Sequence, residues 1–387
     1  MYPWFVEFQK VNDFPSIHTS NIKNTAGSGA DVWLTCFDTK VGENLQVYSG
    51  DSEGSVYIFE AIETWREARE CIFKLALAQE RIHRIGIIQI LLVIQENLIF
   101  TIGYDQELKW FEATEREQQN AVSNPNKALY TSICWDYKEH ELYAADDKGY
   151  VYIINVYHED KVVTKKLCEK KINRIQILRQ EIEPNVYDPK FGVLLVHTDY
   201  CIQSYNIKKG VKTTEMEGHT EPILKIIVLE PSKMLRSEEE KVPDSPKVIT
   251  CSLDNTILLW DFEKMEIITK MEAPEHSELS CMTFLYNCCL VATGHEDGAI
   301  RLWNMEINSS VLLKCNESQK HKNTISCIHG TVWKDSEFLF CGSYDGKISV
   351  WEISEKKASG GGNTHSSTIY PQLRHLIDNT KVNKDNS

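Results

Sequence analysis

The sequence has no excess of basic residues, no C-x-x-C pair and no uninterrupted apolar run long enough to cross a bilayer. Its 387 residues include 42 Lys and Arg against 56 Asp and Glu, which gives a formal net charge of -14. An acidic chain of this kind is repelled by phosphate backbones, so nucleic acid is not an expected ligand. Neutral or basic protein partners are favoured instead.

Segments for membrane insertion or secretion are also missing from the pattern. The most apolar stretch, residues 85–100, is interrupted by Gln89, Gln95, Glu96 and Asn97, whereas a spanning helix needs about 20 apolar residues. The opening MYPWFVEFQK lacks the basic region followed by an apolar region that marks a secretory signal. We therefore expect no membrane span and a cytoplasmic location.

The cysteines and glycines indicate no cofactor or metal site. Twelve cysteines without a secretory signal favour reduced thiols over disulfides or zinc ligation. The runs GSG at 27–29 and GGG at 360–362 are linkers and do not fit a phosphate-binding loop. We expect no bound cofactor and no metal.

What the sequence does contain is an internal repeat. Seven segments share small or polar residues, then a turn rich in acidic residues and glycine, then an alternating strand that ends in a large apolar residue. These segments are 48–60, 100–112, 143–155, 196–206, 249–261, 291–304 and 340–352. Period-two alternation indicates strands, and the turns are typical of hairpins. With one further strand before each hairpin and one often after it, the pattern predicts four strands per repeat.

The repeat resembles the WD-repeat β-propeller family. The resemblance depends on the pair Gly218-His219, on Trp260-Asp261, and on Asp254 six positions before that tryptophan. The sixth and seventh segments carry matching residues, namely His276, Asp297 and Trp303, then His321, Asp345 and Trp351. Segments one to four keep the hairpin and lack the histidine and the tryptophan. The resemblance implies an all-β fold with seven blades over residues 31–354.

Ser252, His219 and Asp254 are also the residue types of a hydrolase triad. The resemblance implies a different role, in which His219, a hydroxyl from Thr250 or Ser252, Asp254 and Trp260 form a buried structural network. The same constellation recurs three times, whereas an active site is assembled once. We therefore expect a brace and no catalytic residue.

The two ends of the chain are expected to differ in structure. After Trp351 the sequence becomes rich in glycine and serine, so residues 355–387 are predicted to be a flexible linker and tail. An N-terminal arm, residues 1–30, contains spare strand material at 16–22. We expect this arm to supply the outer strand of the last blade and to close the propeller.

Two surfaces are predicted to bind partners. Turns between the second and third strands carry aromatic and acidic side chains, and longer loops on the opposite face offer anchors. The predicted contact residues are Tyr104, Asp105, Tyr200, His295, Glu296 and Tyr344 on the first face, and Trp65 and Tyr187 on the second.

These features predict a non-enzymatic scaffold for protein assembly, as a subunit of a larger complex. The resemblance alone favours a ciliary or cytoskeletal setting. An alternative is the substrate receptor of a ubiquitin ligase, which in this family uses a Trp-Asp-x-Arg ending, but Trp260-Asp261 is followed by Phe262 and Glu263. A propeller hydrolase is the third class, and alanine at His219 separates it from a structural role.

Overall fold

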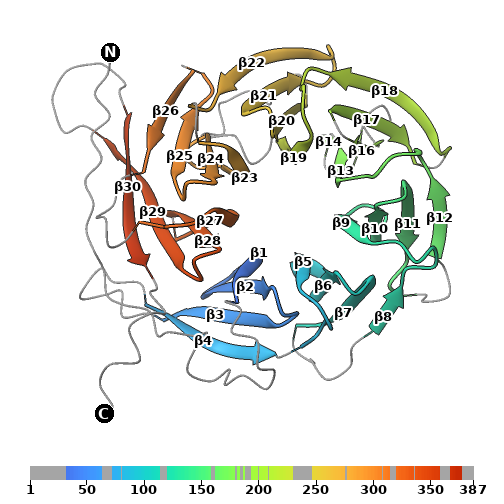
Figure 1. Cartoon of the computed structure of the whole chain (residues 1–387), viewed down its shortest axis with the longest axis horizontal. Helices are drawn as coiled ribbons and strands as arrows, with labels where there is room; N and C mark the ends of the chain where they lie inside the picture. Colours follow the sequence, from blue (N-terminus) through green and yellow to red (C-terminus); the bar gives the residue numbers. More distant parts are fainter. Residues whose placement is uncertain are drawn as a thin grey trace. The chain divides into compact units, whose positions relative to one another are not determined.

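The structure of the protein is a computed structural model. It describes residues 32–62, 72–79, 81–113, 120–157, 162–178, 181–183, 186–187, 193–198, 200–207, 209–229, 246–274, 277–306, 308–313, 320–334, 336–357 and 367–376. These residues form seven four-stranded antiparallel sheets and one two-stranded hairpin (Figure 1). In each four-stranded sheet, which we call a blade, the strands are hydrogen-bonded in chain order. The prediction of an all-β fold with four strands per repeat is confirmed.

The chain divides into two compact units. Unit 1 takes in residues of 1–82 and 280–387, and unit 2 takes in residues 83–279. Each unit is described by itself below.

Unit 1 contains the first blade and the last two. Its strands are β1 (Leu34–Val41), β2 (Leu45–Asp51), β3 (Val56–Ile62), β4 (Ile72–Gln79), β23 (Leu279–Leu285), β24 (Leu290–His295), β25 (Ile300–Asn304), β26 (Ser309–Leu312), β27 (Ile325–Trp333), β28 (Ser336–Ser343), β29 (Ile348–Lys357) and β30 (Ser367–Leu376). The innermost strands β1 and β27 pack side by side, so the first and last blades share one apolar core that contains Phe37, Phe59 and Phe340.

Unit 2 contains the four middle blades. Its strands are β5 (Ile87–Val93), β6 (Leu98–Gly103), β7 (Glu107–Glu112), β8 (Asn120–Ser123), β9 (Tyr130–Asp136), β10 (Glu141–Asp146), β11 (Tyr150–Ile154), β12 (Val162–Lys166), β13 (Arg174–Leu178), β14 (Glu181–Glu183), β15 (Val186–Tyr187), β16 (Val193–Thr198), β17 (Cys201–Asn206), β18 (Val211–Glu217), β19 (Ile223–Leu229), β20 (Lys247–Ser252), β21 (Thr256–Asp261) and β22 (Glu266–Glu272). A short 3-10 turn, η1 (Ile94–Glu96), connects β5 to β6.

A repeated turn joins the second and third strands of the blades. The residue after the second strand donates its backbone N–H to the carbonyl just before the first strand, as in Leu253 to Pro222 and Tyr344 to Thr324. The third turn residue has a positive φ, with Asn255 at 63° and Gly346 at 73°. Glycine and asparagine adopt this conformation at low cost, which explains the turn composition that the sequence repeats.

Neighbouring blades are joined by hydrogen bonds near the start of their inner strands. Ser280 donates to the carbonyl of Ile325 over 2.8 Å, and Ser326 donates to the carbonyl of Leu34 over 2.7 Å. In unit 2, Thr131 donates to the carbonyl of Ile172 over 2.6 Å. The last blade is therefore joined to the first by the same kind of bond that joins consecutive blades.

The outer strand of the last blade comes from the C-terminal side of the chain. β30 pairs with β29 from Ser349 opposite Leu376 to Lys357 opposite Ser367. The prediction of an N-terminal strand at this edge is therefore wrong, and residues 16–22 lie outside the described residues. β30 contains Pro371, and an outer strand tolerates a proline because a backbone N–H at an edge does not need a partner in the sheet. The segment 355–387, predicted to be a linker and tail, thus contains β30.

Candidate functional site

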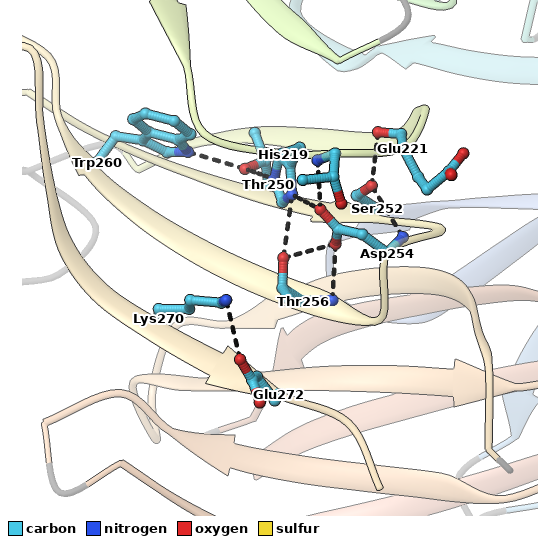
Figure 2. A network of polar contacts seen from close by, with 10 residues as sticks. His219, Glu221, Thr250, Ser252, Asp254, Thr256, Trp260, Lys270 and Glu272 are labelled. Carbon is cyan, nitrogen blue, oxygen red and sulfur yellow. Dashed lines mark hydrogen bonds and ion pairs between the residues drawn. The ribbon is translucent and has the colours of Figure 1, made fainter. Parts of the chain in front are cut away.

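A cluster of ionisable and hydroxyl side chains in unit 2 lies between β19 and β21 (Figure 2). His219 precedes β19, Thr250 lies on β20, and Asp254 lies in the turn before β21. Thr250 Oγ1 is 2.7 Å from His219 Nε2, and Asp254 Oδ2 is 2.9 Å from His219 Nδ1. Trp260 Nε1 donates to the same threonine hydroxyl over 2.8 Å. The four side chains form one continuous chain of hydrogen bonds.

The two hydroxyls that the sequence left open have different roles. Ser252 donates to the carbonyl of Glu221 over 2.8 Å and accepts from the N–H of Asp254 over 3.2 Å. It therefore holds the turn, and Thr250 is the hydroxyl of the network. Figure 2 shows Ser252 beside Asp254 and away from Trp260.

The network fixes the protonation of the imidazole. Burial lowers the pKa of His219 below its ordinary value of 6.5, against the opposing effect of Asp254, so the neutral ring is favoured. A carboxylate only accepts hydrogen bonds, so Nδ1 carries the proton and Nε2 accepts from Thr250. Burial would raise the pKa of Asp254, but the Thr256 hydroxyl, the Thr220 N–H and His219 together lower it below 3.8.

Gly218 explains why a glycine precedes the histidine. A Cβ atom at this position would lie 2.7 Å from the Trp260 ring and 2.9 Å from Ile267. Real Cβ contacts are longer than this, so a side chain at 218 would displace the indole from Thr250. The Gly-His pair of the sequence is thus one packing unit with the tryptophan.

The order hydroxyl, imidazole, carboxylate is that of a Ser-His-Asp hydrolase. Thr250 is nevertheless fully buried, at 0% exposure, and its oxygen already accepts the indole N–H. A substrate carbonyl cannot reach an oxygen that is buried and hydrogen-bonded in this way. The arrangement satisfies buried polar groups and braces the blade.

The blade β27–β30 in unit 1 builds the same network with its hydroxyl on the third strand. His321 Nε2 is 2.8 Å from Ser349 Oγ, and Trp351 Nε1 donates to that oxygen over 3.1 Å. Ser349 lies opposite Cys341, the position that corresponds to Thr250. Burial would raise the pKa of Asp345, but hydrogen bonds from His321 and from two backbone N–H groups lower it to about 2.

The blade β23–β26 differs from the prediction. Trp303 Nε1 donates to Thr293 over 2.8 Å, and Thr293 is 2.9 Å from Nε2 of His295. His295 is fully buried, so it belongs to the network and is not a surface contact residue as predicted. His276, which was predicted for this role, lies outside the described residues. Asp297 accepts a backbone N–H in the turn.

A further network in the blade β5–β8 was missed. His83 Nδ1 is 2.8 Å from Asp105 Oδ1, and its Nε2 is 2.9 Å from Thr101. Burial lowers the pKa of His83 against the effect of Asp105, which shows the same preference for a neutral ring. Asp105 is therefore part of a brace, and its role as a contact residue stays a prediction. The spacing of 22 residues between His83 and Asp105, close to the 24 between His321 and Asp345, was the available signal.

Two other blades use tyrosine in place of histidine. In β9–β12, Tyr152 donates to Asp146 over 2.7 Å, and in β1–β4, Tyr57 donates to Asp51 over 3.2 Å. Asp146 and Asp51 end the second strands, the position that Ser252 holds in β20. Both carboxylates are fully buried, and burial raises the pKa of Asp51.

The other predicted contact residues on the turn face are exposed. Tyr104 is 54% exposed, Tyr200 48% and Tyr344 43%, and Glu296 is also exposed. Tyr104 and Tyr200 lie in unit 2, in the turns between β6 and β7 and between β16 and β17. The turn between β20 and β21 adds Leu253, which is 45% exposed and was not predicted.

Tyr344 has an aromatic neighbour that the sequence did not indicate. The ring of Trp33 meets the ring of Tyr344 edge to face, with centroids 5.4 Å apart. The Trp33 backbone exchanges hydrogen bonds with Ser52, which fixes the start of β1 beside this turn. Unit 1 therefore presents an aromatic pair where the sequence predicted one tyrosine.

The predicted anchors of the opposite face remain untested. Trp65 lies outside the described residues, and Tyr187 belongs to β15 of the small hairpin. Among the described residues, no group of three or more His, Cys, Asp or Glu side chains is placed to bind a metal ion. The described part of the chain also has no helix that is long and apolar enough to span a membrane. Ten cysteines are described, and these ten form no disulfide.

Comparison with known families and proteins agrees with this architecture. The WD domain, G-beta repeat matches residues 240–261, 267–304 and 313–352. The second and third matches each end at the tryptophan-bearing third strand, in β25 and β29. All three matched segments therefore lie where the His, hydroxyl and Trp networks are most complete.

Similar proteins include the human WD repeat-containing protein 41, which is 27% identical over 168 residues, 41% of this chain and 34% of that protein. The ribosome biogenesis protein WDR12 homolog of Ixodes scapularis is 28% identical over 115 residues, 30% of this chain and 26% of that protein. The WD repeat-containing protein 91 homolog of Dictyostelium discoideum is 28% identical over 135 residues, 34% of this chain and 15% of that protein. The chain thus spans about a third or less of the length of these relatives. The repeated blades, their buried networks and these matches make the chain similar to the WD40-repeat β-propeller family.

Proposed function

We propose that the protein is a non-enzymatic scaffold that binds partner proteins through the turns between the second and third strands of its blades. The observation that carries this proposal is the exposed apolar side chain at three of these turns in unit 2, namely Tyr104, Tyr200 and Leu253. Side chains in such turns contribute nothing to the core, and loops on a rigid scaffold are common binding positions.

Rigidity of the turns supports the proposal. Asp105 and Asp254 follow the exposed Tyr104 and Leu253 directly, and each is fixed by a buried histidine. The exposed side chain is therefore attached to a backbone that does not need to be ordered on binding. Preorganisation of this kind reduces the entropic cost of association.

Charge supports neutral or basic partners. The chain carries a formal net charge of -14, which disfavours acidic ligands and speeds the encounter with cationic ones. In unit 1, Glu296 lies in the corresponding turn of β24 and β25, and the Trp33 and Tyr344 pair lies at the turn of the next blade. Aromatic side chains beside a carboxylate suit a peptide with a basic residue.

The test compares two variants of the full chain by affinity purification and quantitative mass spectrometry. The turn variant replaces Tyr104, Tyr200 and Leu253 by serine. The control variant replaces three apolar residues of similar exposure on outer strands, Val163, Val211 and Ile268, by serine. We expect specific partners of the wild type to be lost from the turn variant and kept by the control, and loss from both or from neither contradicts the proposal.

The finer assignments stay predictions. A ciliary or cytoskeletal location and a cytoplasmic location are supported by no contact described above, and the relatives carry names from different processes. The receptor role in a ubiquitin ligase lacks its arginine, because Glu263 occupies that position after Trp260 and Asp261. Location by fluorescence microscopy of the tagged full chain tests the first two.

A further inference from the structure

A second surface in unit 2 lies at the opposite end of the strands from the turns described above. It consists of Ile94 and Glu96 in η1, Tyr137 and His140 in the turn between β9 and β10, and Tyr157 after β11. We call this set the Glu96 surface. It spans two adjacent blades.

Glu96 connects the parts of this surface. Its Oε1 lies 2.6 Å from Nδ1 of His140, and its Oε2 accepts a hydrogen bond from the hydroxyl of Tyr157. The bond to Glu96 raises the pKa of Tyr157 to about 12, so the phenol remains a donor at neutral pH. The same bond lowers the pKa of Glu96 and keeps it a carboxylate.

The surrounding backbone is held in place. Asp136, almost fully buried, accepts from the N–H groups of Lys138 and Glu139 and fixes the turn that carries Tyr137 and His140. The N–H of Asn97 donates to the carbonyl of Ile94 and closes η1. These hydrogen bonds fix the two turns, and the N–H of Tyr157 donates to Oδ1 of Asn155 over 3.0 Å.

These contacts leave large apolar groups exposed. Tyr157 remains 57% exposed, Tyr137 52% and Ile94 47%. A purely structural brace between blades requires Glu96, His140 and the Tyr157 hydroxyl, but it does not require Ile94 or Tyr137 to face solvent. Clustered exposed aromatic and aliphatic side chains on a fixed backbone are typical of interaction surfaces.

The charge of the Glu96 surface indicates which kind of ligand it can bind. Glu96 lies within it, Glu139 lies in the same turn as Tyr137 and His140, and Glu112 is exposed at the end of β7. Lys138 is the one lysine or arginine of the two turns, and His140 is already bound to Glu96. A guanidinium or ammonium group can pair with these carboxylates and lie over a tyrosine ring, whereas a phosphate is repelled.

We propose that the Glu96 surface binds a peptide segment of a partner protein in which an Arg or Lys lies next to a large apolar residue. The surface deepens the scaffold role proposed above, on which it rests, because it gives the protein a second binding face. Tyr137, Tyr157 and Ile94 bury the apolar residue, and Glu96 pairs with the cation. The Tyr157 hydroxyl bond fixes the ring, which reduces the cost of ordering it on binding.

The test uses the full chain and a phage library of random dodecapeptides. Peptides that bind the wild type are synthesised with a fluorescent label and titrated by anisotropy against variants. We expect Tyr157→Ala to weaken binding about tenfold or more, as for an aromatic hot spot. Glu96→Gln is expected to weaken it about threefold at low salt, as for a partly exposed ion pair.

Two further variants keep the test independent of folding. Tyr137→Ala removes a second exposed ring of the surface, and it should weaken the same peptides. Tyr157→Phe keeps the ring and loses the hydroxyl, so it should retain most of the affinity. Tyr104→Ala is measured as well, because it reports on the turn face. The matched control is Val211→Ala, with an apolar side chain of similar exposure on the outer strand β18. It should leave these peptides unaffected.

Several results overturn the inference. One is a selection that yields no peptides, or yields acidic ones. Another is equal affinity for the wild type, Tyr157→Ala and Tyr137→Ala. Peptides that lose affinity only with Tyr104→Ala would support the turn face and reject the Glu96 surface, so the two proposals fail separately.

Discussion

Two blades of unit 2, β19–β22 and β9–β12, stabilise the same corner of a sheet with different side chains. In the first, His219, Thr250, Asp254 and Trp260 form the network. In the second, Asp146 ends β10 at the position of Ser252 and is bonded by Tyr152. The carboxylate of the second blade thus lies two positions earlier in the repeat than Asp254 does in the first, and a tyrosine takes the place of the histidine.

The comparison teaches that the corner requires a buried acceptor and does not require a particular sequence motif. Asp146 accepts from the backbone N–H groups of Lys148 and Tyr150 over 2.9 Å each, besides Tyr152 and Asn124. Asp254 accepts from Thr220 and Thr256 in the corresponding way. A buried carboxylate in both blades thus satisfies turn N–H groups that otherwise lack a partner.

The largest effect is expected at Asp146. Asp146→Ala leaves four donors without their acceptor at a fully buried position, and we expect a loss of about 3–5 kcal/mol in the free energy of unfolding. Urea unfolding monitored by circular dichroism measures it. The neighbouring Asp147 accepts one backbone N–H, from Leu129, so Asp147→Ala should cost about 1 kcal/mol. Equal losses of stability for the two variants would show that the hydrogen bonds to Asp146, including that from Tyr152, do not stabilise this corner of the sheet.

The next effect tests the centre of the histidine network. Thr250→Val keeps the shape and removes the hydroxyl, which leaves the Trp260 indole N–H and His219 Nε2 buried without partners. We expect a loss of about 2–4 kcal/mol and faster amide hydrogen exchange in β20 and β21. Thr250→Ser keeps the hydroxyl and should cost less than half as much. A result in which serine and valine are equally destabilising would assign the effect to packing.

The contrast between these two blades also explains what the sequence predicted. The all-β class and the hairpins could be predicted because period two and the turn residues are local signals. The networks at Trp260 and Trp351 could be predicted for the same reason, since their Asp and Trp lie in one hairpin. His83 was missed because the residue before it is Ile82, so the Gly-His pair that marks His219 is absent. The glycine that packs against this imidazole is Gly103, where a Cβ atom would lie 2.6 Å from Nδ1 of His83.

Other parts depended on contacts that no local pattern contains. His295 has the exposed-turn spacing of a contact residue. In the folded chain it is buried and bonded to Thr293 of the same strand, whose hydroxyl also accepts from Trp303 of β25. The outer strand of the last blade was expected from the N-terminal side, because its actual source, β30, follows a glycine-rich stretch. The Glu96 surface joins residues 61 positions apart, so it appears only in the folded chain.

Lowering the pH should destabilise the blade β19–β22 more than the blade β9–β12. The loss in free energy of unfolding is expected to be smaller than for the two substitutions above. The pKa of His219 lies below 6.5 in the folded state, so the unfolded state binds this proton at a higher pH than the folded state does. Stability from this group is thus present above pH 6.5 and is lost as the pH falls below it, by up to about 1.4 kcal/mol per pH unit. The lowered pKa of Asp254 adds a further loss below pH 3.8.

The measurement is hydrogen exchange by mass spectrometry at pH 7.5 and 5.5, corrected for the intrinsic exchange rate. We expect opening of β21 to become easier at pH 5.5 relative to β11, whose network contains no histidine. His219→Gln should reduce the difference between the two strands. An equal response of β21 and β11 in the wild type would rule out the imidazole as its source.

The last prediction concerns the indole alone. The blade β5–β8 has Phe111 at the position of Trp260, and its His83 and Thr101 pair forms without an indole N–H. Trp260→Phe should therefore convert one network into the other at a cost of about 1–2 kcal/mol, from the lost hydrogen bond and some packing. Trp135 offers a matched control, because its buried Nε1 has no hydrogen-bond partner within the described residues. Trp135→Phe loses packing without a hydrogen bond, so the difference between the two urea midpoints measures the bond to Thr250. A Trp260→Phe variant no less stable than Trp135→Phe would mean that histidine and hydroxyl brace the blade by themselves, as they do in β5–β8.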